Sequence, residues 1–358
     1  MHCELILAIN PGSTSTKIAV FQGTKELFLK NIKHTFDDLS GFKMISEQYE
    51  FRKSIILKEL ESAGFKLKQF AMVVGCGGLV KPIISGVYEV NDALVHDLRV
   101  GVQGQHASNL GGLIASDIAQ SLPSARAFIA DPVVVDELQP LARITGHPLF
   151  ERTSIFHALN QKAIARQYAK SISRPYEELN LIVAHLGGGI SVGAHCKGRV
   201  IDVNQALHGE GPFSPERSGT LPVGALVTLC FSGEYTEEQI KKMITGKGGY
   251  VAYLGTNDAY EVEKRANSGD EKAAFIQEAM AYQVSKEIGA LSTVLKGEID
   301  AILLTGGIAY GKPFVESVSE RVKHLAPIFV YPGEDEMRAL AMNGLMLLKG
   351  EIEPKVYE

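Results

Sequence analysis

Two short stretches of this sequence concentrate groups that can bind phosphate. In the first, residues 4–21 (ELILAINPGSTSTKIAVF), a polar turn separates two apolar segments that we expect to be strands. Its N–H and O–H groups can replace water around an anion, while an ammonium group offsets the charge. The turn lacks the GxxxxGK[ST] spacing of a P-loop and continues into a strand. A plain polar hairpin is the alternative to a phosphate loop formed by Asn10, Ser13, Ser15 and Lys17.

The second stretch is a run of three glycines between apolar segments at residues 181–184 and 190–194. Adjacent glycines cost backbone entropy, so they are expected where the chain turns tightly or a ligand approaches its N–H groups. A long loop follows that has neither a helical nor an alternating pattern and contains His208, Glu210 and Arg217. Such a loop is usually functional or disordered. A glycine-rich hairpin followed by a surface loop is the alternative interpretation.

Two more candidate side chains lie at predicted element ends. Asp131 follows an apolar segment at residues 127–130 and precedes a proline, which places its carboxylate at the carboxyl end of a strand. A simple turn aspartate is the alternative. Residues 153–154 (Thr-Ser) can cap a helix from 155 to about 171. We then expect His157 in the first turn of that helix, where an anion is favoured.

A third glycine turn follows the apolar segment 301–304. Residues 306–312 match GxxxxGK, but Pro313 replaces the Ser or Thr that would hold magnesium. We interpret this stretch as a strand–glycine–helix turn that admits a flat nucleoside against bare backbone.

Strands alternate with helices throughout, which indicates an α/β protein. The chain has 358 residues and is 45% hydrophobic, which suggests two domains. The strand–turn–strand plan of residues 4–21 recurs at 181–194. This weak repeat indicates a duplicated domain with two loops that face one cleft.

The composition argues against several classes of partner. A net charge of −5 without basic runs disfavours nucleic acid and anionic membranes. The sequence shows no signal peptide and no apolar run of membrane-spanning length, so we expect a soluble, cytoplasmic protein. Its cysteines form no CxxC pair and predict neither a disulfide framework nor a zinc site; they are Cys3, Cys76, Cys196 and Cys230.

Five motifs occur in order: INPGSTSTK, AHLGGG, HGEGPFSPERSGTLP, LTGGIAYGKP and YPGEDEMRAL. Together they resemble the acetate and butyrate kinase family, whose fold belongs to the actin-like, hexokinase-like ATPase superfamily. SIFHALNQK and HGEGPFSPERSGTLP are similar to the butyrate kinase branch. The resemblance runs from about residue 4 to about residue 350, nearly the whole chain.

The resemblance implies a carboxylate kinase that transfers the γ-phosphate of ATP reversibly to butyrate or a related short or branched-chain fatty acid, with Mg²⁺. The matching catalytic positions are Asp131, His157 and Arg217. Residues expected to bind the nucleotide and its phosphates are Asn10, Ser13, Ser15, Lys17, His185, Gly187, Gly188, Gly189, Asp258, Gly306, Gly307 and Gly311. The metal positions are Asn10 and Glu336, with Glu334 or Asp335 as alternatives to the glutamate.

The resemblance also implies two similar actin-like, ribonuclease H-like domains with the active site in the cleft between them. We expect an ATPase-fold domain at 1–150 and a nucleotide-binding domain at 151–334, with the last helix, about 335–358, packing back on the first. A homodimer or a higher homo-oligomer is expected.

The chemistry of the acceptor fits these positions. A fatty-acid carboxylate is already ionised at neutral pH and needs no general base, but its attack on an anion needs cations and donors. Arg217 is the best candidate for the equatorial phosphoryl oxygens, and His157 can donate to the same charge. Asp131 is then expected to orient magnesium, water or Arg217.

Two positions depart from the family pattern. Cys76 stands where the family usually has an arginine linked to the acyl carboxylate, so that Lys81 or Arg217 would have to substitute. Tyr260 replaces the arginine of an Asp-x-Arg motif near the nucleotide, and its ring could stack on adenine. Two alternatives remain: a sugar or polyol kinase with Asp131 as a true base, and a nucleotide-binding module without kinase chemistry.

Overall fold

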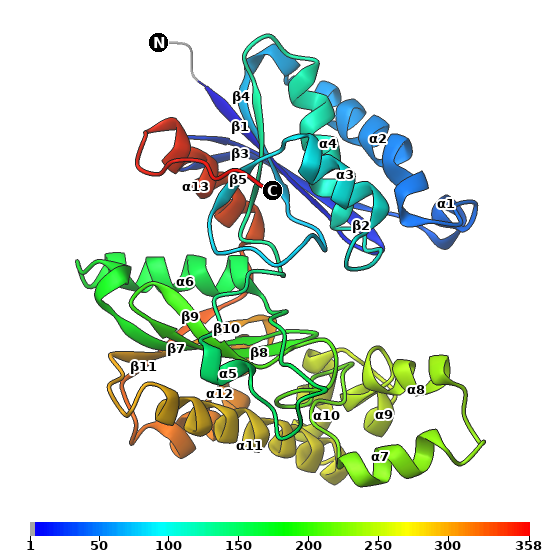
Figure 1. Cartoon of the computed structure of the whole chain (residues 1–358), viewed down its shortest axis with the longest axis vertical. Coiled ribbons are helices and arrows are strands. Elements are labelled where there is room, and N and C mark those ends of the chain that lie inside the picture. Colours follow the sequence, from blue (N-terminus) through cyan, green and yellow to red (C-terminus); the bar gives the residue numbers. More distant parts are fainter. Residues whose placement is uncertain (1–3) are drawn as a thin grey trace. The chain divides into compact units, whose positions relative to one another are not determined.

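The computed structural model describes residues 4–358, which divide into two compact units (Figure 1). The first unit extends to Val135 and resumes at Asp335–Glu358, and the second is Asp136–Glu334. The first division therefore lies between residues 135 and 136 rather than near residue 150, and the C-terminal segment belongs to the first unit. Cys3 lies outside the described residues.

The first unit is built on a mixed six-stranded sheet in the order β3-β2-β1-β4-β6-β5. Strands β1, β2 and β3 are antiparallel neighbours, whereas β4 and β6 run parallel to β1. The strands are β1 (Leu5–Pro11), β2 (Ser15–Gln22), β3 (Lys25–Lys33), β4 (Phe70–Cys76), β5 (Val87–Glu89) and β6 (Arg126–Ala130).

Helices cover both faces of this sheet. Alternate residues of β1 point to opposite faces. Leu7 and Ile9 pack in one core with α2 and α4, whereas Ile6 approaches Gly344 of α13 on the other face. Figure 1 shows α13, in red, and α2, in blue, on opposite sides of the sheet. The helices are α1 (Phe36–Ser40), α2 (Tyr49–Ser62), α3 (Asp92–Val100), α4 (Asn109–Gln120) and α13 (Glu336–Leu348).

The second unit holds a five-stranded sheet in the order β11-β10-β7-β8-β9. Helix α6 packs on one face, and α11 and α12 pack on the other. The strands are β7 (Asn180–Leu186), β8 (Ile190–Cys196), β9 (Arg199–Val203), β10 (Ala301–Gly306) and β11 (Ile328–Pro332). The helices are α5 (Pro140–Arg143), α6 (Ala158–Ser171), α7 (Val223–Cys230), α8 (Glu237–Ile244), α9 (Gly249–Leu254), α10 (Ala259–Asn267), α11 (Glu271–Val294) and α12 (Lys312–Val322).

The two sheets repeat one topology. In each unit an antiparallel hairpin adds a third strand, and two later strands run parallel to the first one. The order β3-β2-β1-β4-β6 therefore corresponds to β9-β8-β7-β10-β11, as the weak sequence repeat predicted. Parallel strands bring their carboxyl ends to one edge of each sheet, which is where open α/β sheets bind ligands.

Some local expectations differ from the structure. The sequence has a helical pattern over residues 93–121, whereas the structure has two helices there, because Gly101 ends α3 in the left-handed conformation with φ 67°. Helix α6 begins at Ala158 with His157 as its N-cap residue, so residues 153–154 do not cap it. Among the described residues, no helix is both long and apolar enough to cross a membrane.

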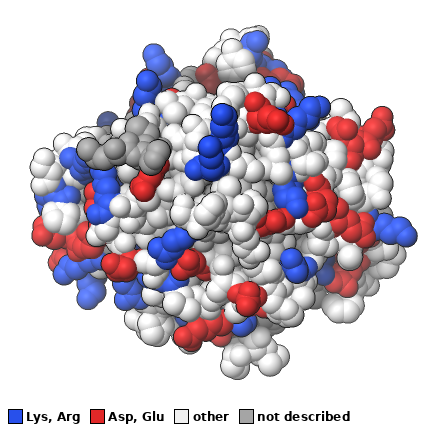
Figure 2. Space-filling view, turned by 90° about the horizontal axis from the view of Figure 1, so that it is seen from above, with Lys and Arg blue, Asp and Glu red and all other residues white. Residues whose placement is uncertain are grey.

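The charged residues are mixed on the face shown in Figure 2. Blue and red side chains alternate over it, and its described part carries no continuous basic surface. This mixture of charges agrees with the net charge of −5.

Candidate functional site

The β1–β2 turn is held from behind by an arginine. Arg52 on α2 is fully buried, and burial lowers its pKa, yet a guanidinium stays protonated in proteins. Nη1 donates to Gly12 O at 2.8 Å and Ser15 O at 2.9 Å, and Nη2 donates to Ser13 O at 3.3 Å. The carbonyls are thus occupied, while the side chains of Ser13, Ser15 and Lys17 keep some exposure. Arg52 was not among the residues predicted from the sequence.

Three carboxylates follow one another near the start of α13, and each has a different partner. Glu336 Oε2 accepts from Asn10 Nδ2 at 2.5 Å within the first unit. Asp335 accepts from Arg338 N and caps α13. Glu334 belongs to the second unit, where its Oε1 lies 3.2 Å from His185 Nε2. Within the first unit, Glu336 therefore lies beside the expected metal residue Asn10.

Asn10 and Glu336 supply a donor set that suits a hydrated magnesium ion. Amide and carboxylate oxygens are hard ligands, and Mg²⁺ commonly takes one or two carboxylates together with water and substrate phosphates. Across residues 4–358 no group of three or more His, Cys, Asp or Glu side chains could hold a metal ion. The residues fit a metal held largely by phosphate and water rather than a closed protein cage.

Asp131 is a buried carboxylate at the carboxyl end of β6. Its Oδ1 accepts from Ser85 Oγ at 2.6 Å and from Gly86 N at 2.8 Å. Its φ of 37° is unusual for a residue other than glycine, and strained backbone of this kind clusters at functional sites. Two donors to one oxygen fix the orientation of this carboxylate.

Cys76 ends β4 at the same edge of the sheet and packs tightly. A Cβ added to Gly111 would lie 2.8 Å from its sulfur. Burial, followed by the nearby Glu336, raises the pKa of the thiol. Lys81, the proposed substitute cation, pairs with Asp97 at 3.5 Å and donates to Glu358 O. Cys76 is therefore a neutral packing residue, and Lys81 is already engaged.

In the second unit, the three glycines form the turn between β7 and β8. Arg217 fills the space beside Gly189, where an added Cβ would lie 1.9 Å from Nη1. Nη1 donates to Ala206 O at 2.7 Å, whereas the buried Nε has no hydrogen-bond partner. An unsatisfied buried donor is costly, so this guanidinium is prepared to bind an additional acceptor.

Two histidines stack beside this turn. The rings of His157 and His185 lie 3.8 Å apart at 12° to each other. His185 Nδ1 lies 2.8 Å from Asn160 Oδ1, and His157 Nδ1 lies 2.9 Å from Ser191 Oγ. Burial, followed by the charges of His185 and Arg217, holds the pKa of His157 well below its usual value. His157 is therefore neutral near pH 7.

The third glycine turn joins β10 to α12. Gly306 has φ 92°, and a Cβ there would lie 2.3 Å from Leu186 O, so glycine is required. Gly307 faces open space, with no atom within 4 Å of an added Cβ. At Gly311 a Cβ would meet a carboxylate oxygen of Glu263 at 2.5 Å. The turn thus exposes bare backbone at Gly307.

Asp258 and Tyr260 lie at the start of α10. Asp258 accepts from Tyr260 N at 2.9 Å and Glu261 N at 3.2 Å, so it caps this helix. The ring of Tyr260 is 68% exposed and lies 5.2 Å from Lys264 Nζ. Contact of either residue with a nucleotide stays a prediction.

The predicted residues form two groups, one in each unit. In the first, Asn10, Glu336 and Asp131 lie near the carboxyl ends of β1 and β6, with the β1–β2 turn. The second group comprises His157, His185, Gly187, Gly188, Gly189, Arg217, Gly306 and Gly307. Each group offers hydrogen-bond donors and cations near the carboxyl ends of strands. This arrangement suits the binding and transfer of phosphoryl groups.

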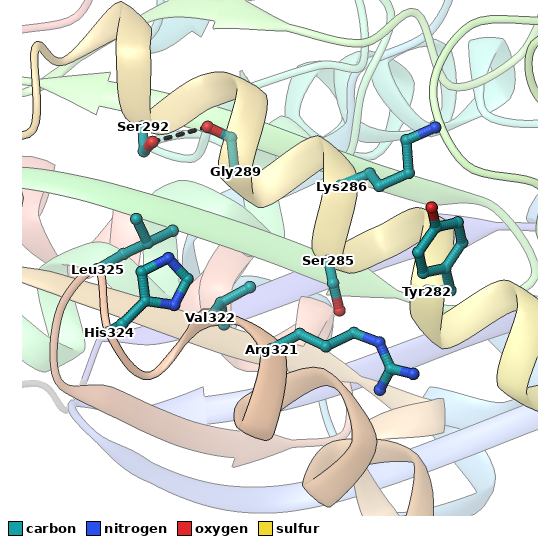
Figure 3. A pocket seen from close by; sticks show the side chains of 9 residues that line it. All are labelled: Tyr282, Ser285, Lys286, Gly289, Ser292, Arg321, Val322, His324 and Leu325. Carbon is teal, nitrogen blue, oxygen red and sulfur yellow. Dashed lines mark hydrogen bonds between the residues drawn. The ribbon is translucent and has the colours of Figure 1, made fainter.

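A cavity of about 390 Å³ in the second unit is separate from these residues. It lies between α11 and α12 (Figure 3), and Ser285 and Arg321 are among its lining residues. None of the predicted site residues lines it.

Comparison with known proteins gives the family. Residues 148–331 match the model of the acetokinase family. The chain is 56% identical to butyrate kinase 2 and 55% identical to butyrate kinase 1 of Clostridium acetobutylicum, in each case over 99% of both chains. The chain belongs to the acetokinase family. It is accordingly a phosphotransferase of the carboxylate-kinase type, and this kinase chemistry uses ATP and ADP.

Solved structures of acetokinase relatives share the fold. The acetate kinase of Porphyromonas gingivalis has a TM-score of 0.78 at 16% identity and covers 96% of this chain and 100% of its own. A propionate kinase of Francisella tularensis has a TM-score of 0.75 at 18% identity, with 95% and 98% covered. These likenesses confirm the predicted fold class, two α/β domains of the actin-like ATPase type.

Proposed function

We propose that this carboxylate kinase transfers the γ-phosphate of ATP reversibly to butyrate or a closely related short or branched-chain fatty acid, and so forms an acyl phosphate and ADP. The observation that carries the proposal is Arg217, whose buried Nε lacks a partner beside a glycine turn and a neutral histidine. The full-length similarity to two proteins named butyrate kinase supports the choice of acid.

In this proposal Arg217 and His157 stabilise the charge that develops during transfer. The acceptor carboxylate is ionised near pH 7 and attacks without losing a proton, so no general base is required. Its approach to a phosphate is opposed by like charge, which the guanidinium reduces. His157, being neutral, donates one hydrogen bond to an equatorial oxygen. Asp131 has an oriented, doubly hydrogen-bonded oxygen and acts as an orienting group.

The nucleotide is proposed to use groups from three turns. Ser13, Ser15 and Lys17 bind phosphate, supported by Arg52, which occupies the backbone carbonyls of that turn. The glycines at 187–189 offer N–H groups to the phosphates, and the open backbone at Gly307 accommodates adenosine. Asn10 and Glu336 would hold Mg²⁺ through oxygen atoms and water. The ion would neutralise charge on the phosphates during transfer.

We propose a homodimer or a higher homo-oligomer. Helix α7 is uncharged, and none of its residues is buried. Val223 is 72% exposed, and Phe231, which follows the helix, is 87% exposed. Exposed apolar surface of this kind usually marks an interface. Sedimentation velocity of the wild type and of Phe231→Ser would detect the assembly.

We also propose a cytoplasmic location.

The function is tested by trapping acyl phosphate with hydroxylamine. The assay contains ATP, magnesium and one acid from a series that runs from acetate to valerate and includes isobutyrate. Maximal hydroxamate formation with butyrate or isobutyrate is expected. Maximal activity with acetate would overturn the choice of acid, and hydroxamate formation with none of the acids would overturn the function.

A sugar or polyol kinase would behave differently. If Asp131 were a general base, the rate would fall on the acid side of the pH profile as this carboxylate became protonated. Asp131→Asn would then abolish the activity, whereas the removal of an orienting group leaves a measurable rate.

A further inference from the structure

His157 is the last member of a buried hydrogen-bond chain within the second unit. Tyr176 Oη lies 2.6 Å from His195 Nδ1, and His195 Nε2 lies 2.9 Å from Gln161 Oε1. Gln161 Nε2 lies 2.9 Å from Ser191 Oγ, which in turn lies 2.9 Å from His157 Nδ1. The side chains of Gln161, Ser191 and His195 are completely buried. The directions of these hydrogen bonds can be determined from the partners.

The amide of Gln161 has a fixed orientation. Its Nε2 also lies 3.0 Å from the backbone carbonyl oxygen of Ser191. A carbonyl oxygen only accepts, so the amide nitrogen, and not the oxygen, must face Ser191. Gln161 Oε1 therefore faces His195, and His195 must donate from Nε2. Burial, followed by the charges of Lys162 and Arg166, holds the pKa of His195 well below its usual value, so its Nδ1 accepts from Tyr176.

The same logic fixes the proton of His157. Ser191 Oγ accepts from Gln161 Nε2 at 2.9 Å and from His157 N at 3.4 Å, which uses both of its lone pairs. Its own hydroxyl proton is then directed to His157 Nδ1. His157 is neutral and carries one ring proton, which must therefore be on Nε2. Every member of the chain donates in the direction of His157.

We propose that Gln161 and Ser191 are positioning residues that hold His157 as the tautomer with its proton on Nε2, so that this nitrogen donates to the transferring phosphoryl group. This inference deepens the proposed function and rests on it. A neutral imidazole with the opposite tautomer would present a lone pair to an anionic oxygen and would repel it.

The backbone next to the chain leaves room for this arrangement. A Cβ added to Gly193 would lie 2.5 Å from Gln161 Oε1 and 3.3 Å from His195 Nε2. Glycine at this position in β8 thus permits the bond between Gln161 and His195. A fully satisfied polar network of this kind holds its side chains rigidly in a low-dielectric interior.

The decisive experiment is ¹⁵N NMR of the full-length protein labelled in its histidines, with His157→Gln to assign the His157 signals. In the wild type without substrate, His157 is expected to show a protonated Nε2 and an unprotonated Nδ1. A protonated Nδ1 would overturn the inference. Because this NMR measurement needs no turnover, its outcome does not depend on the proposed function. The hydroxamate assay tests that function separately.

Gln161→Glu is designed to reverse the direction of the hydrogen bond between residue 161 and Ser191. An ionised carboxylate at position 161 can only accept, so Ser191 would donate to it and the proton of His157 would move to Nδ1. Burial favours the protonated carboxyl, which still donates, so the variant is compared with wild type from about pH 6 to about pH 9. Its kcat relative to wild type is expected to fall with rising pH, by about 10²-fold on full ionisation, with KM for ATP within about threefold.

Gln283→Glu is the matched control. Gln283 lies in the same unit and only accepts, from Phe213 N at 3.1 Å, so a carboxylate preserves its bond. Its kcat profile and the His157 signals are expected to remain as in wild type. If Gln161→Glu keeps both its kcat and the Nε2 proton throughout, or if Gln283→Glu loses as much kcat, the positioning role is rejected.

Ser191→Ala provides a second test if Gln161→Glu does not fold. It removes the hydroxyl that orients His157 Nδ1, and kcat is expected to fall about tenfold with KM for ATP nearly unchanged. Ser285→Ala removes another buried hydroxyl in the same unit, that of the serine labelled in Figure 3, which donates to Ala281 O of its own helix. Equal kcat losses in the two serine variants would overturn the inference.

Discussion

Arg217 occupies the space that any side chain at residue 189 would need. A Cβ added to Gly189 would lie 1.9 Å from Nη1 of Arg217 and 2.5 Å from its Cζ. The glycine is thus required by the guanidinium rather than by its own φ angle, which is not in the left-handed region. The turn between β7 and β8 and the loop that carries Arg217 are therefore matched to each other.

We predict that Gly189→Ala displaces Arg217 and lowers kcat by about 10²-fold, since a misplaced transition-state donor is nearly as costly as a missing one. The variant is expected to remain folded because the displaced group is the end of a long side chain. Gly224→Ala on α7 is the control, because an added Cβ meets no atom within 4 Å there. Steady-state kinetics of both variants, with thermal melting as a check of folding, would measure this. Unchanged kcat in Gly189→Ala would contradict the assigned role of Arg217.

The second prediction concerns Arg52. Arg52→Met removes the hydrogen bonds from the guanidinium to three carbonyls of the β1–β2 turn, of which Ser15 O would still accept from Gly12 N. We expect a loss of about 3 kcal/mol in the free energy of unfolding and an increase of about tenfold or more in KM for ATP. Arg126→Met is the control because Arg126 forms an exposed pair with Glu89. Urea denaturation and initial-rate kinetics would measure both effects, and similar stabilities of the two variants would refute this account.

The third prediction distinguishes a glycine that the fold requires from an adjacent glycine that nucleotide binding requires. Gly306→Ala is expected to destabilise the second unit, because φ is 92° and the Cβ would meet Leu186 O at 2.3 Å. Gly307→Ala is expected to leave stability within about 0.5 kcal/mol but to weaken ADP binding about tenfold, because its methyl group would fill the space proposed for adenosine. Thermal melting and calorimetric titration with ADP would measure these. ADP affinity that is unchanged in Gly307→Ala would exclude this turn as the adenosine site.

The fourth prediction concerns the pH dependence of stability. The folded-state pKa values of His157 and His195 lie well below the usual value near 6.5, because burial disfavours the charged ring. As pH falls below about 6.5, the unfolded chain binds protons at these rings that the folded protein excludes, so stability is lost with acidification. Above about pH 7.5 this contribution is fully present. Each histidine contributes at most about 1.4 kcal/mol per pH unit.

Urea denaturation at about pH 7.5 and about pH 5.5 would measure this loss. His195→Gln is expected to reduce the difference in stability between the two pH values, since one of the two histidines with strongly lowered pKa values is absent. His324→Gln is the control, because His324 is an exposed residue and its replacement should preserve the wild-type difference. A difference as large in His195→Gln as in wild type would show that another group causes the acid sensitivity.

The strands and the glycine turns that follow them could be predicted from the sequence. The buried side chains that hydrogen-bond to these turns could not. Strands such as the one at Leu181 to Ala184 could be recognised because a buried strand is a short apolar run, and glycines follow this one closely in the sequence. The family was recognised from five motifs, and the comparisons confirm it. Arg52 was missed because its partners are backbone carbonyls about forty residues away, and no local pattern distinguishes a buried arginine from one on the solvated face of a helix.

The three consecutive acidic residues at the start of α13 show the same limit. The resemblance implied Glu336 as the metal position and left Glu334 and Asp335 as alternatives. The choice depends on long-range contacts, since Asn10 is separated from Glu336 by 326 positions in the chain. Likewise, the hydrogen bonds of Gln161 could not be predicted from the sequence. They depend on how α6 packs against β8, which carries Ser191 and His195.

The return of the chain to the first unit has a consequence for biosynthesis. Helix α13 covers one face of a sheet whose strands are made near the beginning of translation, and Met337 and Leu340 are buried in it. The second unit is continuous in sequence, so it can fold as soon as it leaves the ribosome. The first unit, although synthesised earlier, must wait with an uncovered apolar face until residues 335–348 emerge. The second unit can thus complete its fold before the first, and the uncovered sheet is the surface that a chaperone would have to protect.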